Sequence, residues 1–344
     1  MVEAGPNDKI YPVGKLAAIV DALAEEVTLP ADALGHIQLS EEAISSPNTR
    51  VSINQLIECC RLAMKLSRDP FFAYRTGLKF HVSTYGMYGF SILSSTNFRQ
   101  TMQFAVRYHQ LAVPLANISF REQDGHGIWT INPVPHPAVD APLYRFLVEM
   151  QFGVHISLHR DVMGPTFTPQ ELHVTYAALF DMQQYHDAFA CNVLFGRADN
   201  ELVFDAAWLD AIPQLGNKIT YPVILKMCGE MLDEFQLRKG LSGKVREALL
   251  VNLTQPTSLD AIARFLKMSP RTLRRKLQEE NTSFRKLLDE LRIHVAIKYL
   301  RDTELTVDEI GNALGFGDAA NFRHAFHRWT KLSPHQFRTI AGKT

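Results

Sequence analysis

Residues 258–279 encode two helices separated by a tight turn, and they read SLDAIARFLKMSPRTLRRKLQE. Ser258 suits a helix N-cap because its hydroxyl can accept a hydrogen bond from an amide that has no partner inside the helix. Apolar residues then recur at helical spacing as far as Leu266. Ser269 followed by Pro270 is a strong start signal for a second helix. The stretch therefore predicts a helix-turn-helix unit.

The same pattern returns about 48 residues later, since Ile310 stands 48 positions after Ile262. The residues Thr306-Val-Asp-Glu309 form a capping box at the start of the repeated unit. A helical pattern from Ser283 to about Arg301 joins the two units. We therefore expect an all-α C-terminal domain over residues 241–344, in which a linker helix joins two helix-turn-helix units.

Charge is divided unevenly along the 344 residues, which contain 36 Lys and Arg and 36 Asp and Glu. Residues 241–344 hold 18 basic and 11 acidic residues (+7), which leaves 18 basic and 25 acidic residues (−7) for residues 1–240. Such asymmetry indicates that one module faces a polyanion. The apolar fraction of 46% and the charged fraction of 21% are typical of globular proteins and exclude fibrous classes and general disorder.

Basic residues gather on the outward side of the second helix of the first unit. This side carries Arg271, Arg274, Arg275 and Gln278. Arginine can donate two hydrogen bonds to O6 and N7 of guanine. A helical bundle whose charges only face solvent is the alternative. A short helix, a tight turn and a longer second helix are typical of a major-groove reader, so we expect binding to double-stranded DNA.

Residues 241–340 resemble the DNA-binding domain of the AraC/XylS family of transcription regulators. The resemblance is carried by MSPRTLRRKLQEENTSF (residues 268–284), by Arg292 in the linker and by LTVDEIGNALGFGDAANFRHAFHRWTKLSPHQFR (residues 305–338). It implies that each unit places one recognition helix in the major groove, in successive segments on one face of promoter DNA. It also implies contact with RNA polymerase.

The resemblance assigns DNA contacts by position. In the first unit it implies base reading by Arg271, Arg274 and Arg275, with Gln278 beside them, and phosphate contact by Thr272 and Lys276. In the second unit it points to Ala320, Asn321, Arg323 and His324.

The chain departs from the family pattern at four positions. Asn281 and Lys331 stand where glycine is usual, Gly311 stands where alanine is usual, and His324 stands where arginine is common. Asparagine tolerates the left-handed conformation, so we expect the turn at Asn281 to be intact. With His324 in place of arginine, the second unit either reads bases or only grips the DNA backbone.

The acidic part, residues 1–220, is expected to be a mixed α/β domain dominated by helix. Helical patterns cover residues 13–26, 52–66, 97–112 and 142–160, and strand-like runs cover residues 117–121, 128–131, 171–175 and 202–204. Residues 15–215 are similar to the arabinose-binding-like domain of one branch of the same family, through YGMYGFSILSSTNFRQTMQFAVRYHQL and FACNVLFGRADNELVFDAAWL. The resemblance implies a sensor of a small molecule and does not name the molecule.

Between the two domains, residues 221–240 are expected to be a linker or dimer helix. Apolar residues recur at helical spacing from Tyr221 to Leu237. This helix either pairs two copies of the chain into a homodimer, supports the DNA-binding part as a strut, or packs on its own domain.

Candidate contacts to a small-molecule effector are polar residues that interrupt apolar stretches. They are His81, Tyr85, Tyr88, Arg107, His109 and Arg145. Arg145 could hold a carboxylate through two hydrogen bonds. An ordinary surface or core role is the alternative for each residue. His155 and His159 have the spacing of a metal-binding pair but no third ligand at a characteristic distance, so no metal or cofactor is expected.

The cysteines and the apolar stretches indicate a cytoplasmic protein. Cys59, Cys60, Cys191 and Cys228 form no C-x-x-C pair, which is typical of reduced thiols. The N-terminal residues show no secretory signal. The longest uncharged stretch, residues 80–98, is too polar to span a membrane.

Three functions fit these observations. The first is a DNA-binding transcription regulator whose activity a small-molecule effector modulates. The second is an enzyme fused to the same DNA-binding module, as in the adaptive-response DNA methyl acceptors, which requires an activated cysteine or a catalytic motif that the sequence does not show. The third is a constitutive or protein-responsive regulator whose N-terminal domain only oligomerises. We expect the first, with a non-enzymatic chain.

Overall fold

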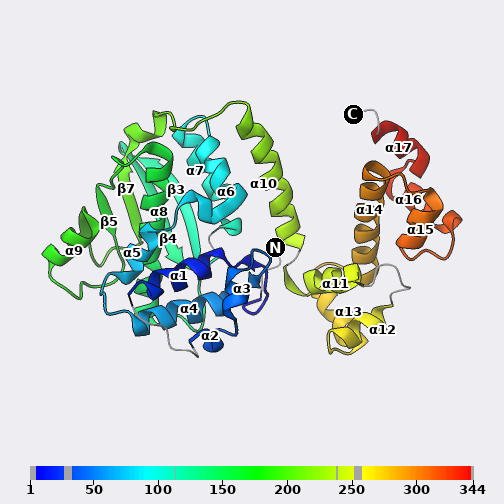
Figure 1. Cartoon of the computed structure of the whole chain (residues 1–344), viewed down its shortest axis with the longest axis horizontal. Coiled ribbons are helices and arrows are strands. Elements are labelled where there is room, and N and C mark those ends of the chain that lie inside the picture. The colour runs from blue at the N-terminus through cyan, green and yellow to red at the C-terminus, as the bar shows by residue number, and fades with distance from the viewer. Residues whose placement is uncertain (1–4, 27–32, 113, 238, 252–257, 342–344) are drawn as a thin grey trace. The chain divides into compact units, whose positions relative to one another are not determined.

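A computed structural model describes residues 5–26, 33–112, 114–237, 239–251 and 258–341. Within these residues the chain divides into two compact units, one formed by Pro6–Phe235 and one that contains the described residues from Gln236 onward (Figure 1). The first unit is mixed α/β and dominated by helix, and the second is all-α. The fold class expected from the sequence is confirmed.

A five-stranded sheet forms the centre of the first unit, in the order β3-β4-β7-β5-β6. The strands are β3 (Ala116–Gln123), β4 (His126–Pro133), β5 (Glu171–His173), β6 (Asn192–Leu194) and β7 (Glu201–Asp205). Neighbouring strands are antiparallel except β5 and β6, which are parallel. The β3–β4 hairpin turns at Asp124-Gly125, both at positive φ, as a two-residue hairpin turn requires.

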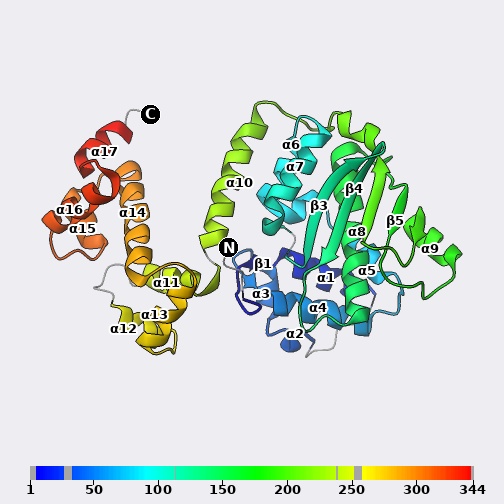
Figure 2. The same ribbon diagram turned by 180° about the vertical axis from the view of Figure 1, so that it is seen from behind.

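One long helix, α8 (Ala141–Met163), lies across one face of this sheet, as the two opposite views show (Figures 1 and 2). A second helix, α5 (Phe72–Leu78), crosses α8 in close contact. The crossing requires two glycines, because a Cβ on Gly77 would lie 2.2 Å from the carbonyl oxygen of Met150, and one on Gly153 would lie 2.2 Å from that of Tyr74. The two helix backbones therefore pack directly on each other.

The remaining helices of this unit lie around α8 and beside the sheet, whose face opposite α8 is open in the view of Figure 2. They are α1 (Gly14–Ala24), α2 (Ala33–His36), α3 (Glu41–Ser45), α4 (Ile53–Leu66), α6 (Gly86–Ser94), α7 (Phe98–Tyr108), α9 (Met182–Phe189), α10 (Thr220–Leu237) and the short 3₁₀ turns η1 (Val82–Tyr85), η2 (His109–Leu111) and η3 (Ala206–Asp210). A small second sheet pairs β1 (Tyr11–Pro12) with β2 (Arg50–Val51).

The four predicted helices are confirmed as α1, α4, α7 and α8, with residues 109–111 of the third forming η2 instead of continuing α7. The four strand-like runs are confirmed as β3, β4, β5 and β7. The sequence patterns did not predict β1, β2, β6, α5, α6 and α9. Each of these elements is short, and most of its contacts are with distant parts of the chain.

The second unit contains both predicted helix-turn-helix units. Its helices are α11 (Gly240–Val251), α12 (Leu259–Phe265), α13 (Pro270–Glu279), α14 (Phe284–Asp302), α15 (Val307–Ala313), α16 (Ala319–Thr330) and α17 (Pro334–Ala341). The predicted caps form: Ser258 and Ser269 accept from the amides of Ala261 and Thr272. Both hydrogen bonds of the capping box between Thr306 and Glu309 are also present.

Within the all-α part of the chain, the two helix-turn-helix units share one core, to which the linker helix α14 contributes. This core contains the buried side chains of Leu273 and Leu277 of α13, Phe322 and Phe326 of α16, and Leu287, Leu291 and Leu300 of α14. Asn281 has a φ of 56°, so its turn is intact as predicted, and Lys331 adopts the same left-handed conformation with a φ of 62°. A Cβ on Gly311 would lie 3.3 Å from Cβ of Phe322, which accounts for a small residue at this helix contact.

Candidate functional site

The outer face of α13 is rich in free hydrogen-bond donors. Arg271, Arg274, Arg275 and Gln278 are exposed, because Leu273 and Leu277 take the opposite face into the core. Arg271 and Arg274 form no hydrogen bond or ion pair with any described residue, whereas Arg275 pairs with Glu279 one turn along. Thr272 is half-buried, and its hydroxyl lies 2.8 Å from that of the N-cap Ser269. This face can therefore offer two fully available guanidinium groups to a polyanion.

The corresponding face of α16 is more occupied. Ala320, Asn321, Arg323 and His324 are all exposed. The Asn321 side-chain amide donates to the Asp318 carboxylate at 2.8 Å, and Arg323 pairs with Asp308 at 3.0 Å. Two of the four predicted contact residues therefore have partners within the protein, unlike Arg271 and Arg274.

Arg292 of the linker helix α14 holds the second helix-turn-helix unit in place. Its guanidinium donates to the carbonyl oxygens of Leu314 (3.0 Å) and Gly315 (3.2 Å), at the end of α15. It also lies over the ring of Phe316, 4.5 Å from the centroid. Because these carbonyls have no partner within α15, one side chain caps the helix and holds it against α14.

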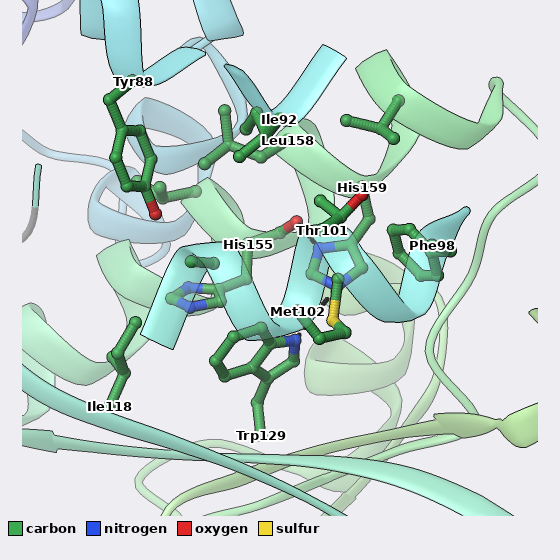
Figure 3. Close-up of a pocket in the computed structure, with 13 residues that line it drawn as sticks. Tyr88, Ile92, Phe98, Thr101, Met102, Ile118, Trp129, His155, Leu158 and His159 are labelled. Atoms are coloured by element: carbon green, nitrogen blue, oxygen red, sulfur yellow. Dashed lines mark hydrogen bonds between the residues drawn. The ribbon is translucent and has the colours of Figure 1, made fainter. Parts of the chain in front are cut away.

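The first unit contains an inner cavity and an outer cleft. The inner cavity, of about 30 Å³, lies between α6, α7, α8 and the sheet, and Tyr88, Trp129 and His155 are on its wall (Figure 3). Its other lining residues are mostly apolar, among them Ile92, Phe98, Met102, Ile118 and Leu158. The outer cleft, of about 280 Å³, has Arg145, Glu149, Arg68 and Phe180 on its wall.

The histidine pair singled out in the sequence is part of the inner wall and is fully hydrogen-bonded at His159. Trp129 donates from Nε1 to Nε2 of His159 at 3.0 Å, and Nδ1 of His159 donates to the carbonyl oxygen of His155. Burial lowers the pKa of His155 to about 4 and that of His159 to about 3, so both imidazoles are neutral at pH 7. Both nitrogens of His159 are thus occupied by protein partners.

Arg145 makes an internal ion pair. Its Nε donates to Glu149 at 2.7 Å, one turn along α8, and its guanidinium faces the rings of Tyr176, Phe180 and Tyr185 at 5.3–5.7 Å. Burial raises the pKa of Glu149, although Arg145 opposes the effect. Only Nε of Arg145 is therefore engaged by Glu149, whereas Nη2 is buried without a hydrogen-bond partner among the described residues.

The other predicted effector contacts do not come together. His81 is exposed and pairs with Asp161 at 2.9 Å, Arg107 is exposed against the ring of Tyr108, and His109 contacts the carbonyl oxygen of Val106 at 2.8 Å. None of these three lines either cavity. Tyr85 and Tyr88 do lie together, with ring centroids 6.0 Å apart.

A buried lysine, Lys15, was missed in the sequence. It lies on the apolar face of α1 with Ile19 and Leu23, and it is only 7% exposed. Its Nζ is 5.8 Å from the ring centroids of Phe80 and Tyr85 and has no hydrogen-bond partner among the described residues. The signal was present, because a lysine four residues before Ile19 falls on the buried side of a helical pattern.

Comparison with known proteins identifies the family to which the chain belongs. Residues 29–212 match the family model for the N-terminal arabinose-binding domain of AraC transcription regulators, and residues 262–340 match that of a helix-turn-helix domain. The chain belongs to the AraC family of transcription regulators. This AraC-family protein is therefore a DNA-binding transcription regulator with an N-terminal arabinose-binding-like domain.

Relatives extend over nearly the whole regulator. An ornithine utilization regulator of Pseudomonas aeruginosa is 26% identical over 331 residues, which is 96% of each chain. The regulator VqsM of the same species is 28% identical over 268 residues, 76% of this chain and 82% of its own. The crystal structure of CdpR, also from P. aeruginosa, shares the fold with a TM-score of 0.51 at 22% identity, over 95% of this chain and 98% of that one.

These relatives are named as transcription regulators, which supports regulation over enzymatic chemistry. Across the described parts of the chain, none of the helices has both the length and the apolar character needed to cross a membrane.

Proposed function

We propose that this AraC-family protein is controlled by a small-molecule effector that binds in the N-terminal domain and changes how the chain engages promoter DNA in the cytoplasm. The proposal is carried by the position of α6. Tyr88 and Ile92 of α6 line the inner cavity, while Ser91 on the same helix lies 3.1 Å from Sγ of Cys228 on α10. A molecule in the cavity would therefore touch the helix that contacts α10.

The helix α10 is suited to carry such a change because it belongs to the N-terminal core and leads toward the DNA-binding unit in sequence. Ile224 and Cys228 are buried in the N-terminal core. Phe235 packs on Tyr11 with ring centroids 5.6 Å apart. The helix continues to Leu237, shortly before α11 begins at Gly240. A displacement of α6 would bias the end of α10 and hence the presentation of the recognition helices.

DNA recognition is proposed to be divided unequally between the two helix-turn-helix units. Arg271 and Arg274 on α13 have no partner among the residues that the structure describes, so they would read bases together with Arg275 and Gln278. On α16 the side chains of Asn321 and Arg323 already have partners, so this helix would mainly grip the backbone, with Ala320 and His324 close to the groove. Thr272 would contact phosphate near the start of α13.

We also propose that the regulator acts as a homodimer through α10 and contacts RNA polymerase at its promoters. Val223, Met227 and Met231 recur every four residues on the side of α10 that faces away from the N-terminal core, and they are 59%, 44% and 41% exposed. A contiguous apolar stripe on a surface helix is typical of helix pairing. A Met227→Glu variant should shift sedimentation of the full chain from dimer to monomer, whereas Glu230→Gln should not.

The effector proposal is tested on the full-length protein with a DNA duplex selected from a random pool. Polarisation titrations with a chemically broad metabolite set should identify a compound that changes the apparent Kd for this duplex. The variant Ala105→Val narrows the inner cavity and should weaken the response to that compound, while Ala105→Ser, of similar size to the native residue, should keep it. Identical DNA binding with every compound would favour the alternative, a constitutive or protein-responsive regulator whose N-terminal domain only oligomerises.

A further inference from the structure

The N-terminal core contains a cluster of polar groups with no partner in the part of the chain that the structure describes. These are Nζ of Lys15, the hydroxyl of Tyr85 and both polar atoms of the Gln151 side chain. Lys15 is 7% exposed and Gln151 is 1% exposed. Native interiors leave few polar groups unpaired, because each loses its hydrogen bonds to water. Several such groups in one region indicate an interior that is completed by another molecule.

The three residues face one region, although they come from α1, η1 and α8. Nζ of Lys15 lies 5.8 Å from the ring centroid of Tyr85. After burial itself, the charge of Lys15 contributes to lowering the pKa of His155, so this lysine faces α8. Gln151 stands one turn before His155 and therefore shares its side of α8.

This region continues into the inner cavity. The ring centroid of Tyr85 is 6.0 Å from that of Tyr88, and Tyr88 and His155 both line the cavity (Figure 3). Beyond them the wall is apolar, with Ile92, Met102 and Trp129. The interior thus has a polar end at Lys15 and an apolar end at the sheet.

The polar groups specify the ligand's chemistry. An ammonium attracts an anion, a phenol hydroxyl donates to one, and a primary amide both donates and accepts. Among the described residues, the titratable groups that interact with Lys15 are Cys60 on α4, Tyr85 on η1 and His155 on α8, and none of these three carries a negative charge at pH 7. A single cation balances a single negative charge, which favours a carboxylate over a phosphate dianion, whose second charge would stay uncompensated.

We propose that Lys15, Tyr85 and Gln151 form the anion-binding end of the effector site, and that the effector is a monocarboxylate whose apolar body extends past Tyr88 toward Trp129. This assignment rests on the proposed effector control and names the chemical class of the effector. A cavity of about 30 Å³ holds little more than one water molecule. The body of the ligand therefore enters only as the surrounding side chains move apart, and this movement displaces α6.

The test uses the full-length protein and calorimetric titration with a graded series of straight-chain and phenyl-substituted carboxylic acids. Each acid is paired with its methyl ester and its primary alcohol as neutral counterparts. At least one acid should bind and change DNA affinity, and its neutral counterparts should bind about tenfold more weakly or worse, since a charged hydrogen bond is lost. A neutral counterpart that binds as tightly as the acid would overturn the proposal.

Substitutions then test which residues bind the carboxylate. Lys15→Met should weaken binding of the acid by about tenfold or more and leave binding of the neutral alcohol unchanged, while Lys65→Met, at an exposed position of α4, should bind both as the wild type does. Tyr85→Phe should have a smaller effect in the same direction. Undiminished acid binding by Lys15→Met would refute the assignment.

The outcomes also separate this inference from the proposed function. A neutral or cationic compound that alone alters DNA binding in the broad metabolite set would support effector control and contradict the carboxylate. A chain whose DNA binding responds to no compound in either set would contradict both.

Discussion

Replacing Lys15 by methionine should make the N-terminal domain more stable, although a native core residue is removed. Burial lowers the pKa of the Lys15 ammonium from 10.5 to about 8. Each tenfold change in proton affinity corresponds to about 1.4 kcal/mol, so the buried charge costs about 3 kcal/mol of folding free energy at pH 7. Methionine keeps the unbranched apolar chain and its packing without the charge. We expect a gain of about 3 kcal/mol, or roughly 6–12 °C in Tm for a unit of this size.

The pH dependence of this gain has a definite sign. The folded-state pKa of Lys15 lies below the unfolded-state value. Between about pH 8 and 10.5 the unfolded chain therefore keeps the proton of Lys15, whereas the folded chain has released it. The advantage of Lys15→Met should therefore be constant below pH 8, shrink from pH 8 to 10.5 and vanish above it. The pKa of the neighbouring Cys60 is about 12 and that of His155 is about 4, so neither group titrates in the folded protein between pH 8 and 10.5.

Chemical denaturation of the two full-length proteins at pH 7 and at pH 10.5 measures this difference, with the N-terminal transition followed by the fluorescence of Trp129 and Trp208 after Trp329 of α16 is replaced by phenylalanine in both proteins. Lys65→Met is the matched control, since this lysine is exposed and its loss should change stability by less than about 0.5 kcal/mol. A Lys15→Met protein that is less stable than the wild type, or whose advantage is the same at both pH values, would show that the ammonium is not held unpaired in the core.

Three other predictions concern the fold and the DNA interface. Arg274→Ala should cost about 1–3 kcal/mol in binding to the selected duplex and relax its specificity; equal weakening on every sequence in a competition assay would mean that Arg274 only contacts phosphate. Gly153→Ala should destabilise the N-terminal domain by about 3 kcal/mol or more in urea, because its Cβ meets backbone at 2.2 Å, whereas Gly35→Ala, with nothing within 4 Å, should be nearly neutral. Arg292→Met should lower the stability of the DNA-binding unit by about 1–3 kcal/mol, and an unchanged urea midpoint would exclude the capping role.

Local signals were sufficient for the DNA-binding unit. The caps at Ser258, Ser269 and Thr306 and the turn at Asn281 each involve residues within about one helical turn, so their geometry depends little on the rest of the chain. The repeat then indicated which apolar side chains meet in a shared core. The exposed arginines of α13 follow from the same periodicity, since Leu273 and Leu277 define the opposite face.

The partners of polar groups in the N-terminal domain were not accessible in this way. The i, i+4 spacing of His155 and His159 gives no indication that Trp129, from strand β4, donates to Nε2 of His159. The pairing of Arg145 with Glu149 is local to α8, but the rings that enclose it come from residues 176–185.

The sequence by itself determined the family, the two helix-turn-helix units and the exposed face of α13, because helix periodicity and capping are properties of short segments. Only the tertiary structure decided that Lys15 is buried with no hydrogen-bond partner among the described residues and that the ring of Tyr85 lies beside it. Periodicity shows which side of a helix faces inward. Whether a charge on that side finds a counter-charge depends on elements brought together from residues 15, 85 and 155. Among the described residues none supplies one to Lys15, and on this observation the proposed effector class depends.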